Sequence, residues 1–232
     1  MKDADTLSPE ALTAALKKSL VFSGLSDAEL AGLSRLAAAR RLEAGQYAFW
    51  EGDTPDYFYI LITGRIKVLK HSSQGKEVII AFFGPGEMFG EVAVFEGRAY
   101  PASAQAAVES QVAAIKKDDL LSFLTAHPQV VLRIINILGG RLREAQGRLK
   151  DLAGERVEQR LARTLLMLSA KLGASLPFTR QEIADMAGTT TETAIRILGR
   201  LKDGGIISST RGEITILNQD KLRLLSEGPP QV

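Results

Sequence analysis

The stretch TRQEIADMAGTTTETAIRILGRLKDGGIIS, residues 179–208, carries the pattern that decides the fold. Thr179 is a residue type that caps helix N-termini and Gly188 one that ends helices, so a helix is predicted over residues 180–187. A second helix is predicted to begin near residues 190–191. Two short helices around a short turn that contains glycine form a helix-turn-helix.

Apolar and polar residues fall on opposite faces of these two helices. The apolar, inward positions are Ile183, Ala184, Ala187, Ala194, Ile197, Leu198 and Leu201. The outward face of the second helix carries Thr191, Glu192, Ile195, Arg196, Gly199 and Arg200. A carboxylate can accept a hydrogen bond from cytosine N4, and an arginine can pair with guanine O6 and N7. This face is therefore suited to reading base edges in a DNA major groove.

A β-hairpin is predicted directly after this helix pair, in ISSTRGEITIL (207–217), and it makes the helix-turn-helix a winged one. Hydroxyl and amide side chains near helix N-termini can bind phosphates, and basic wing residues can add ionic contacts. The predicted DNA-binding residues are Thr179, Gln181, Thr190, Thr191, Glu192, Arg196, Arg200 and Arg211. The alternative is a structural helical hairpin with a solvated polar face, and the spacing, turn and wing together argue against it.

The earlier part of the chain has the pattern of a β-sheet domain. Between about residues 40 and 117, short β-rich runs such as YFYILI, RIKVLK, EVIIAFF and QVAAIK are separated by glycines. Regular short strands with glycine turns predict a β-roll or barrel. Two short helices are predicted before it, with Ser8 and Ser26 as their N-caps.

Residues 118–172 have a helical pattern, and part of it has the spacing of a coiled coil. Apolar residues there alternate four and three positions apart. The predicted homodimer interface consists of Val131, Ile135, Leu138, Leu142, Ala145, Leu149 and Leu152. The alternative is a long helix that lies on the β-roll.

Composition excludes several classes of protein. The chain has 232 residues, a net charge of +2 and no cysteine. The lack of cysteine excludes disulfides, cysteine-ligated iron–sulfur clusters and cysteine-rich zinc sites. The polar N-terminus and the short apolar runs predict a cytoplasmic protein with no membrane association. The sequence contains neither a P-loop nor a dinucleotide-binding fingerprint, so an enzyme is not expected.

The order of β-roll, long helix and winged helix-turn-helix resembles the CRP/FNR family of bacterial transcription regulators, from about residue 22 to 222. The resemblance rests on residues 179–207, with their Glu192-Thr-x-x-Arg196 core, and on AGQYAFWEGD, YFYILITGRIKV and GPGEMFGE in the roll. It implies a homodimer that binds palindromic promoter DNA and works with RNA polymerase. Glu192 and Arg196 match the family's base-reading pair, which implies half-sites with a TGA-like core. Thr191 stands where the cyclic AMP receptor proteins have arginine, so the outer bases are left open.

The predicted fold is therefore α+β, with a cyclic-nucleotide-binding-type β-roll, a long dimerisation helix and a C-terminal winged helix-turn-helix. Residues 1–118 are assigned to the N-terminal helices and sensor roll, and 119–153 to the dimerisation helix region. Residues 154–225 are assigned to the DNA-binding domain, and 226–232 to a disordered tail.

The stretch GEVAVFEGRAYPASAQA, residues 90–106, is predicted to frame an effector pocket and to run into an alternating strand. By the resemblance, Gly90-Glu91 match the pair that binds the ribose hydroxyl of a cyclic nucleotide. Tyr100-Pro101 replace the pair that holds the cyclic phosphate through an arginine, which argues against cyclic AMP or GMP. The predicted pocket residues are Phe89, Gly90, Glu91, Val92, Tyr100, Pro101, Ala102 and Ser103.

The sequence leaves the effector open. Haem can be held by histidine, and His71 and His127 are the only candidates, although a turn and a helix boundary would equally explain them. The pocket strand is similar to that of family members linked to nitric oxide and nitrogen oxides, several of them haem-dependent. The alternatives are another small molecule, no ligand, a cyclic AMP-responsive regulator, and a β-roll module that acts through a protein partner. The target promoters, and activation or repression, are also left open.

Overall fold

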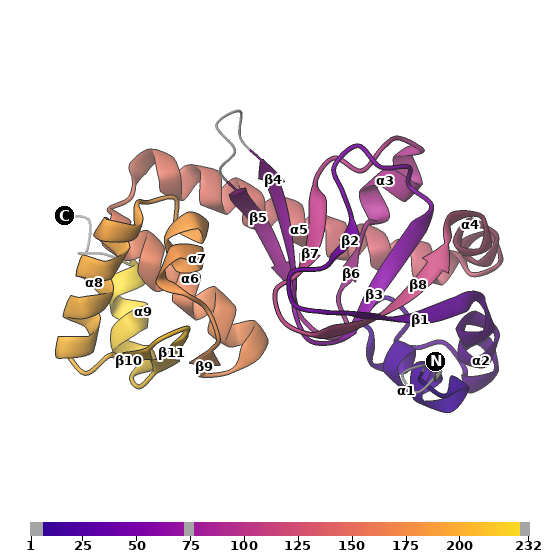
Figure 1. The fold of residues 1–232 in the computed structure, drawn as a ribbon, viewed down its shortest axis with the longest axis horizontal. Coiled ribbons are helices and arrows are strands. Elements are labelled where there is room, and N and C mark those ends of the chain that lie inside the picture. Colours follow the sequence, from indigo (N-terminus) through magenta and orange to yellow (C-terminus); the bar gives the residue numbers. More distant parts are fainter. Residues whose placement is uncertain (1–6, 72–76, 228–232) are drawn as a thin grey trace. The chain divides into compact units, whose positions relative to one another are not determined.

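The computed structural model describes residues 7–71 and 77–227, apart from the side chains of residues 148 and 150–153. The chain forms two compact units, residues 1–141 and 142–232, and the division falls within one long helix (Figure 1). Each unit is described by itself.

Two capped helices begin the first unit. Helix α1 (Pro9–Lys18) follows Ser8, whose hydroxyl accepts a hydrogen bond from the Ala11 backbone N–H. Helix α2 (Asp27–Leu36) begins with a capping box, in which Ser26 and Glu29 satisfy each other's backbone donors. Both predicted N-caps are confirmed.

Two antiparallel four-stranded sheets form the roll (Figure 1). One has the order β1-β8-β3-β6 and the other β2-β7-β4-β5. The strands are β1 (Ala37–Leu42), β2 (Tyr47–Phe49), β3 (Tyr57–Thr63), β4 (Ile66–His71), β5 (Glu77–Phe83), β6 (Met88–Phe89), β7 (Ser103–Ala106) and β8 (Ser110–Lys116). The alternation of side chains in β3 sends Tyr59 and Leu61 into one buried cluster and Phe58 and Ile60 into another. The predicted β-roll is confirmed.

The segment after Gly90 begins with a helix that the sequence did not predict. Residues 91–96 form helix α3 (Glu91–Glu96), and the strand in which the stretch 90–106 ends is β7, which begins at Ser103. Gly90 and Gly97 bound this helix with φ of 79° and 67°, a left-handed conformation that favours glycine. A six-residue helix between two glycines is too short to show a helical period in the sequence.

Helices α4 (Lys117–Ala126) and α5 (Pro128–Gly154) follow the roll. The first part of α5 packs on the roll through Val130 and Ile134, which lie in one core with Phe22, Phe58 and Phe123. No single helix in the described part of the chain has the length and apolar character to cross a membrane, and α4 with part of α5 meets those criteria only as a pair bent by 112°.

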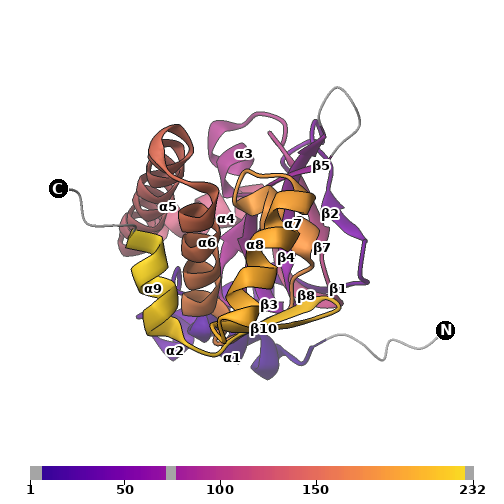
Figure 2. The same cartoon turned by 90° about the vertical axis from the view of Figure 1, so that its left-hand side faces the viewer.

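The second unit is a helical domain with a three-stranded sheet of order β10-β11-β9. Its helices are α6 (Val157–Leu172), α7 (Arg180–Met186), α8 (Thr191–Asp203) and α9 (Gln219–Glu227), and its strands are β9 (Ser175–Leu176), β10 (Ile207–Thr210) and β11 (Glu213–Ile216). Figure 2 shows α9 beside α6. Helix α9 includes Ser226 and Glu227, so the predicted tail began two residues too early, because the buried Ser226 still packs on this unit. Residues 228–232 lie outside the described residues.

Candidate nucleic-acid interface and sensor pocket

Helices α7 and α8 form the predicted helix-turn-helix. Thr179 caps α7: its hydroxyl accepts from the Glu182 N–H at 3.2 Å, and the Glu182 carboxylate accepts from the Thr179 N–H at 2.8 Å. The helix ends before Gly188, whose φ is 63°. Thr190 then caps α8 by accepting from the Thr193 N–H at 3.3 Å. Helix α7 therefore begins and ends within a residue of its predicted bounds, and α8 begins where it was predicted to begin.

The inward and outward faces of the helix pair divide as predicted. All seven predicted inward residues are buried: Ile183, Ala184, Ala187, Ala194, Ile197, Leu198 and Leu201. On the outward face Glu192, Ile195, Arg196 and Arg200 are exposed, while Thr191 and Gly199 are half-buried. Burial of the apolar face fixes the rotation of α8 about its axis, so Glu192 and Arg196 face outward together.

Besides the two capping threonines, the predicted DNA-binding residues Gln181, Thr191 and Arg200 have side-chain contacts within this unit. Thr191 donates a hydrogen bond to the Gln181 side-chain oxygen, and the Gln181 amide nitrogen donates to Asp185 at 2.7 Å. Arg200 lies 3.7 Å from the Glu158 carboxylate with 59% of its side chain exposed, so this ion pair contributes little.

The wing is the hairpin β10–β11, with the exposed Arg211 and Gly212 (φ 80°) at its turn, as predicted. The sequence did not reveal a third strand, β9, in which Leu176 pairs with Ile214. A two-residue strand is too short to show an alternation pattern. Strand β9 pairs with β11 and so connects the wing to the segment before α7.

Aromatic rings surround Gly90 at the predicted sensor pocket. A Cβ added at Gly90 would lie 3.2 Å from Tyr59, 3.3 Å from Phe49 and 3.4 Å from Tyr100. The Phe49 and Tyr100 rings stack with centroids 3.7 Å apart and an angle of 9°, and the Tyr59 and Phe89 rings stack at 4.9 Å and 10°. The four rings and Gly90 therefore form one packed cluster.

Tyr100 is part of the interior of the roll. Its ring is buried, and its hydroxyl donates to the Tyr57 carbonyl at 2.5 Å. Burial raises the pKa of the Tyr100 hydroxyl and raises that of Tyr59 to about 12. At the position where the resemblance places a phosphate-binding pair, this chain thus has a neutral ring with its hydroxyl already bonded.

Glu91 is buried and paired with an arginine of α5. Arg141 donates to the Glu91 carboxylate at 2.8 Å and to the Met88 carbonyl at 2.7 Å, and its guanidinium lies 4.5 Å from the centre of the Phe83 ring. Burial raises the pKa of Glu91, and the Arg141 charge opposes that shift. The carboxylate expected to meet a ligand is therefore bonded to the chain itself.

The remaining predicted pocket residues divide into two groups. Ala102 and Ser103 are buried, and the Ser103 hydroxyl accepts from the Glu51 N–H at 2.9 Å. Val92 and Pro101 are exposed and lie outside the buried cluster, because Val92 is on the outer side of α3 and Pro101 is in the turn before β7. Sequence reasoning missed Phe49, Tyr59 and Arg141, whose pairing with distant residues leaves no local pattern.

Both histidines have contacts that suit a structural role. His127 donates from Nδ1 to the Phe123 carbonyl at 2.8 Å, and its Nε2 lies 3.4 Å from Glu29. His71 is near Trp50, with ring centres 6.3 Å apart, and Trp50 stacks on Tyr47 at 3.5 Å. Among the described residues, no three His, Asp or Glu side chains gather in a metal-binding group.

The exposed face of α5 differs from the predicted dimer seam. Val131 and Leu138 pack against the core of the roll instead of facing outward. The large apolar side chains exposed on α5 are Leu132 (64%), Ile135 (56%), Leu142 (60%) and Leu149 (67%). Ala145 is exposed, and the side chain of Leu152 lies outside the described residues. The exposed stripe thus keeps Ile135, Leu142 and Leu149 of the predicted seam, while the roll takes the face that carries Val131 and Leu138.

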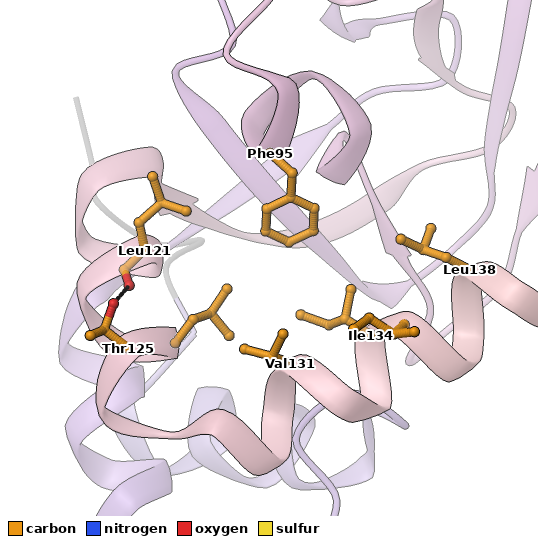
Figure 3. A pocket seen from close by; sticks show the side chains of 8 residues that line it. Phe95, Leu121, Thr125, Val131, Ile134 and Leu138 are labelled. Atoms are coloured by element: carbon orange, nitrogen blue, oxygen red, sulfur yellow. Dashed lines mark hydrogen bonds between the residues drawn. The ribbon is translucent and has the colours of Figure 1, made fainter.

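An apolar cavity of about 440 Å³ lies between α3, α4 and α5 (Figure 3). Its lining residues are Phe95, Leu121, Leu124, Thr125, Val131, Ile134, Ile135 and Leu138. The one hydroxyl, that of Thr125, donates back to the Leu121 carbonyl at 2.9 Å. Val131 and Leu138 of the predicted seam line this cavity together with Ile135.

Two family models match the chain. Residues 39–127 match the cyclic nucleotide-binding domain, and residues 159–225 match the Crp-like helix-turn-helix domain. The two matches correspond to the roll with the start of the helices after it, and to the winged helix-turn-helix.

Similar proteins cover nearly the whole chain. The cyclic AMP receptor protein of Thermus thermophilus is 30% identical over 202 residues, which is 87% of this chain and 94% of that protein. A CRP-like cAMP-activated global transcriptional regulator of Mycobacterium tuberculosis is 26% identical over 215 residues, covering 89% and 96%. The structure of FixK2 from Bradyrhizobium japonicum has a TM-score of 0.75 at 25% identity, and it covers 84% of this chain and 99% of that one.

Proposed function

The chain belongs to the CRP/FNR family of transcription regulators, and on that premise we propose that it binds palindromic promoter DNA as a homodimer controlled by a small molecule other than a cyclic nucleotide. The observation that carries the proposal is the outward face of α8, where Glu192 and Arg196 are exposed on a capped helix with a wing beside it. A dimer would place two such helices in successive major grooves about 34 Å apart.

The base-reading roles divide between two residues. Glu192 would accept from cytosine N4, and Arg196 would pair with guanine, within a TGA-like half-site. Thr191 is bonded to Gln181, so the pair acts at the edge of the half-site, where Thr191 departs from the arginine of the cyclic AMP receptor proteins. Exposed Arg211 on the wing would contact phosphate.

A binding titration tests the DNA-reading proposal. The double variant Glu192→Ala, Arg196→Ala should lose its preference for a palindromic duplex over a scrambled one. Each lost base contact costs about 1–3 kcal/mol. The control is Asp203→Ala, Arg223→Ala, which also removes one acid and one base from exposed positions of this unit. Wild-type selectivity in the first variant would overturn the proposal.

The exposed stripe of α5 supports the homodimer. Leu132, Ile135, Leu142 and Leu149 fall in one heptad register, with Gly139 and Gln146 at the two intervening seam positions. A second copy of the same helix would bury these apolar side chains, which recur in a regular heptad register. The partner face is therefore proposed here, where it keeps Ile135, Leu142 and Leu149 of the seam predicted from sequence and has Leu132 in place of Val131.

Sedimentation of the purified chain tests this face. Leu142→Asp should convert the dimer to a monomer, since a buried seam does not tolerate an unpaired carboxylate. Leu224→Asp is the matched control, because Leu224 is similarly exposed but lies on α9. A dimeric Leu142→Asp variant would contradict the proposed interface.

The filled surroundings of Gly90 support an effector that is not a cyclic nucleotide. Tyr100 stands in place of the phosphate-binding pair, and Arg141 holds the Glu91 carboxylate. Of the two histidines that could hold a haem, His127 does not fit because both of its ring nitrogens have partners. His71, near Trp50, is the remaining candidate for a haem or nitric oxide sensor.

An absorption spectrum of the chain reconstituted with haem decides between these effectors. A Soret band of protein-bound haem that is present in the wild type and lost in His71→Ala would support haem. A wild-type chain without such a band would favour another small molecule. Calorimetric titration should show no heat from cyclic AMP. Binding of cyclic AMP that raises operator affinity would instead establish the cyclic AMP-responsive alternative named for the relatives.

The proposal includes RNA polymerase as a partner and the cytoplasm as the location, because a promoter-bound regulator acts where transcription takes place. A β-roll module that acts only through a protein partner is the second candidate. It would keep the roll but would not require the exposed Glu192 and Arg196.

A further inference from the structure

Arg160 of α6 binds three backbone carbonyls that belong to two separate segments. Its Nε donates to Ala187 at 3.0 Å, its Nη2 to Gly188 at 3.0 Å, and its Nη1 to Glu155 at 2.9 Å. We propose that Arg160 is a positioning residue for DNA recognition, which sets the direction of α8 relative to the corner that follows α5.

The first two contacts lie at the C-terminal end of α7. Carbonyls in the last turn of a helix have no partner within that helix, and a basic side chain can satisfy them. The guanidinium is planar and always charged, so it can bind Ala187 and Gly188 together in one fixed geometry. Lysine, a point donor on a flexible stem, cannot reproduce this geometry.

The turn that Arg160 binds leads directly into α8, the proposed DNA-reading helix. Gly188 has a φ of 63°, and the Thr189 N–H donates to the Ala184 carbonyl at 3.0 Å, so the turn is tightly folded on α7. Thr190, the next residue, is the N-cap of α8. Because α8 begins two residues after Thr189, the position of this turn decides where the helix points.

The third contact lies in the corner between α5 and α6. Besides its carbonyl bond to Arg160, Glu155 pairs through its carboxylate with Arg163 at 2.6 Å. Arg163 also donates to the Ser226 carbonyl of α9 at 3.0 Å. The corner is thus bonded to α6 and, through the Arg160 guanidinium, to the turn before α8.

A binding experiment on the full chain tests the role of Arg160 and rests on the proposed palindromic DNA site. In Arg160→Met and Arg160→Lys, affinity for the palindromic duplex should fall by about tenfold or more, the loss expected when hydrogen bonds of a charged group disappear. Affinity for a scrambled duplex and the melting temperature should stay near wild type in the lysine variant, since its charge is kept. Arg223→Met, a similar change at an exposed site on α9, is the control.

Hydrogen exchange supplies a readout that does not depend on DNA. Residues 184–193 should exchange faster in both Arg160 variants, while the hairpin β10–β11 stays protected. The inference is overturned if both variants keep wild-type selectivity and exchange. It is also overturned if the affinities for the palindromic and the scrambled duplex fall together with the melting temperature. That result would mean that Arg160 only stabilises the fold. A wild-type chain that shows no preference for the palindrome refutes the proposed DNA site, and the exchange rates then decide on Arg160 alone.

Discussion

Gly90 lies where four aromatic rings of the roll meet, and its backbone is left-handed. Gly90→Ala should therefore destabilise the chain in two ways, by backbone strain and by pressing a methyl group against Tyr59, Phe49 and Tyr100. Gly45→Ala is the matched control, because Gly45 has a similar φ of 86° and no heavy atom within 4 Å of an added Cβ. Strain should cost about 1–2 kcal/mol in both, and crowding a further 1–3 kcal/mol only at Gly90, measured by urea unfolding. Equal losses would contradict the packed cluster.

Tyr59 predicts how stability changes in alkaline solution. Burial raises the pKa of its hydroxyl from 10.0 to about 12, so the folded chain holds this proton more tightly than the unfolded chain. Its contribution to stability is fully present below pH 10 and is lost as the pH rises toward 12. Tyr59→Phe should show a smaller loss of unfolding free energy over that interval than wild type. Identical slopes would argue against the buried hydroxyl.

The positions of single residues on the outward face of α8 were easier to predict than the contacts around Gly90. Glu192 and Arg196 lie within one helix, so periodicity alone places them on one face. Phe49 meets Tyr100, and Arg141 meets Glu91, across some fifty residues of chain. Such contacts depend on sheet register and helix placement, which local spacing does not contain.

Helix α5 holds α3 to the roll through one buried ion pair. Arg141→Met would leave the Glu91 carboxylate buried without its partner and should cost about 3–5 kcal/mol. The double variant Glu91→Gln, Arg141→Met should lose less than the sum of the single changes, because no charge is left unpaired. Urea unfolding measures both, with Arg143→Met as an exposed control on the same helix. Additive losses would show that the pair does not couple α3 to α5.

Elements were predictable where caps and periodicity agreed. Thr179 and Gly188 gave α7 its bounds, whereas α3 was not predicted because six residues show no clear period. The exposed apolar stripe on α5 differs from the predicted seam for another reason. Val131 and Leu138 are as apolar as Leu132 and Ile135, and only the presence of the roll decides which pair faces inward.

The whole molecule combines a roll that fits the cyclic nucleotide-binding domain with a winged helix-turn-helix that fits the Crp-like domain. The order of these parts was readable from sequence, because glycine-separated β-runs and the Glu192-Thr-x-x-Arg196 core are local features. The arrangement of residues around Gly90 could be predicted only in part from the sequence. That Tyr100 replaces the phosphate-binding pair is visible in sequence, but that its ring stacks on Phe49 is not.

Trp50 gives the molecule an optical reporter that needs no label. It is the only tryptophan of the chain, lies in the roll, is 48% exposed, and stacks on Tyr47. All tryptophan emission therefore originates in the sensor, and none comes from the unit that meets DNA. If the two functions are coupled, a palindromic duplex should change the emission of Trp50 while a scrambled duplex does not. Unchanged emission at saturation with the palindrome would mean that DNA binding leaves the environment of this indole unaltered. Trp50→Phe, which has no tryptophan emission, is the control.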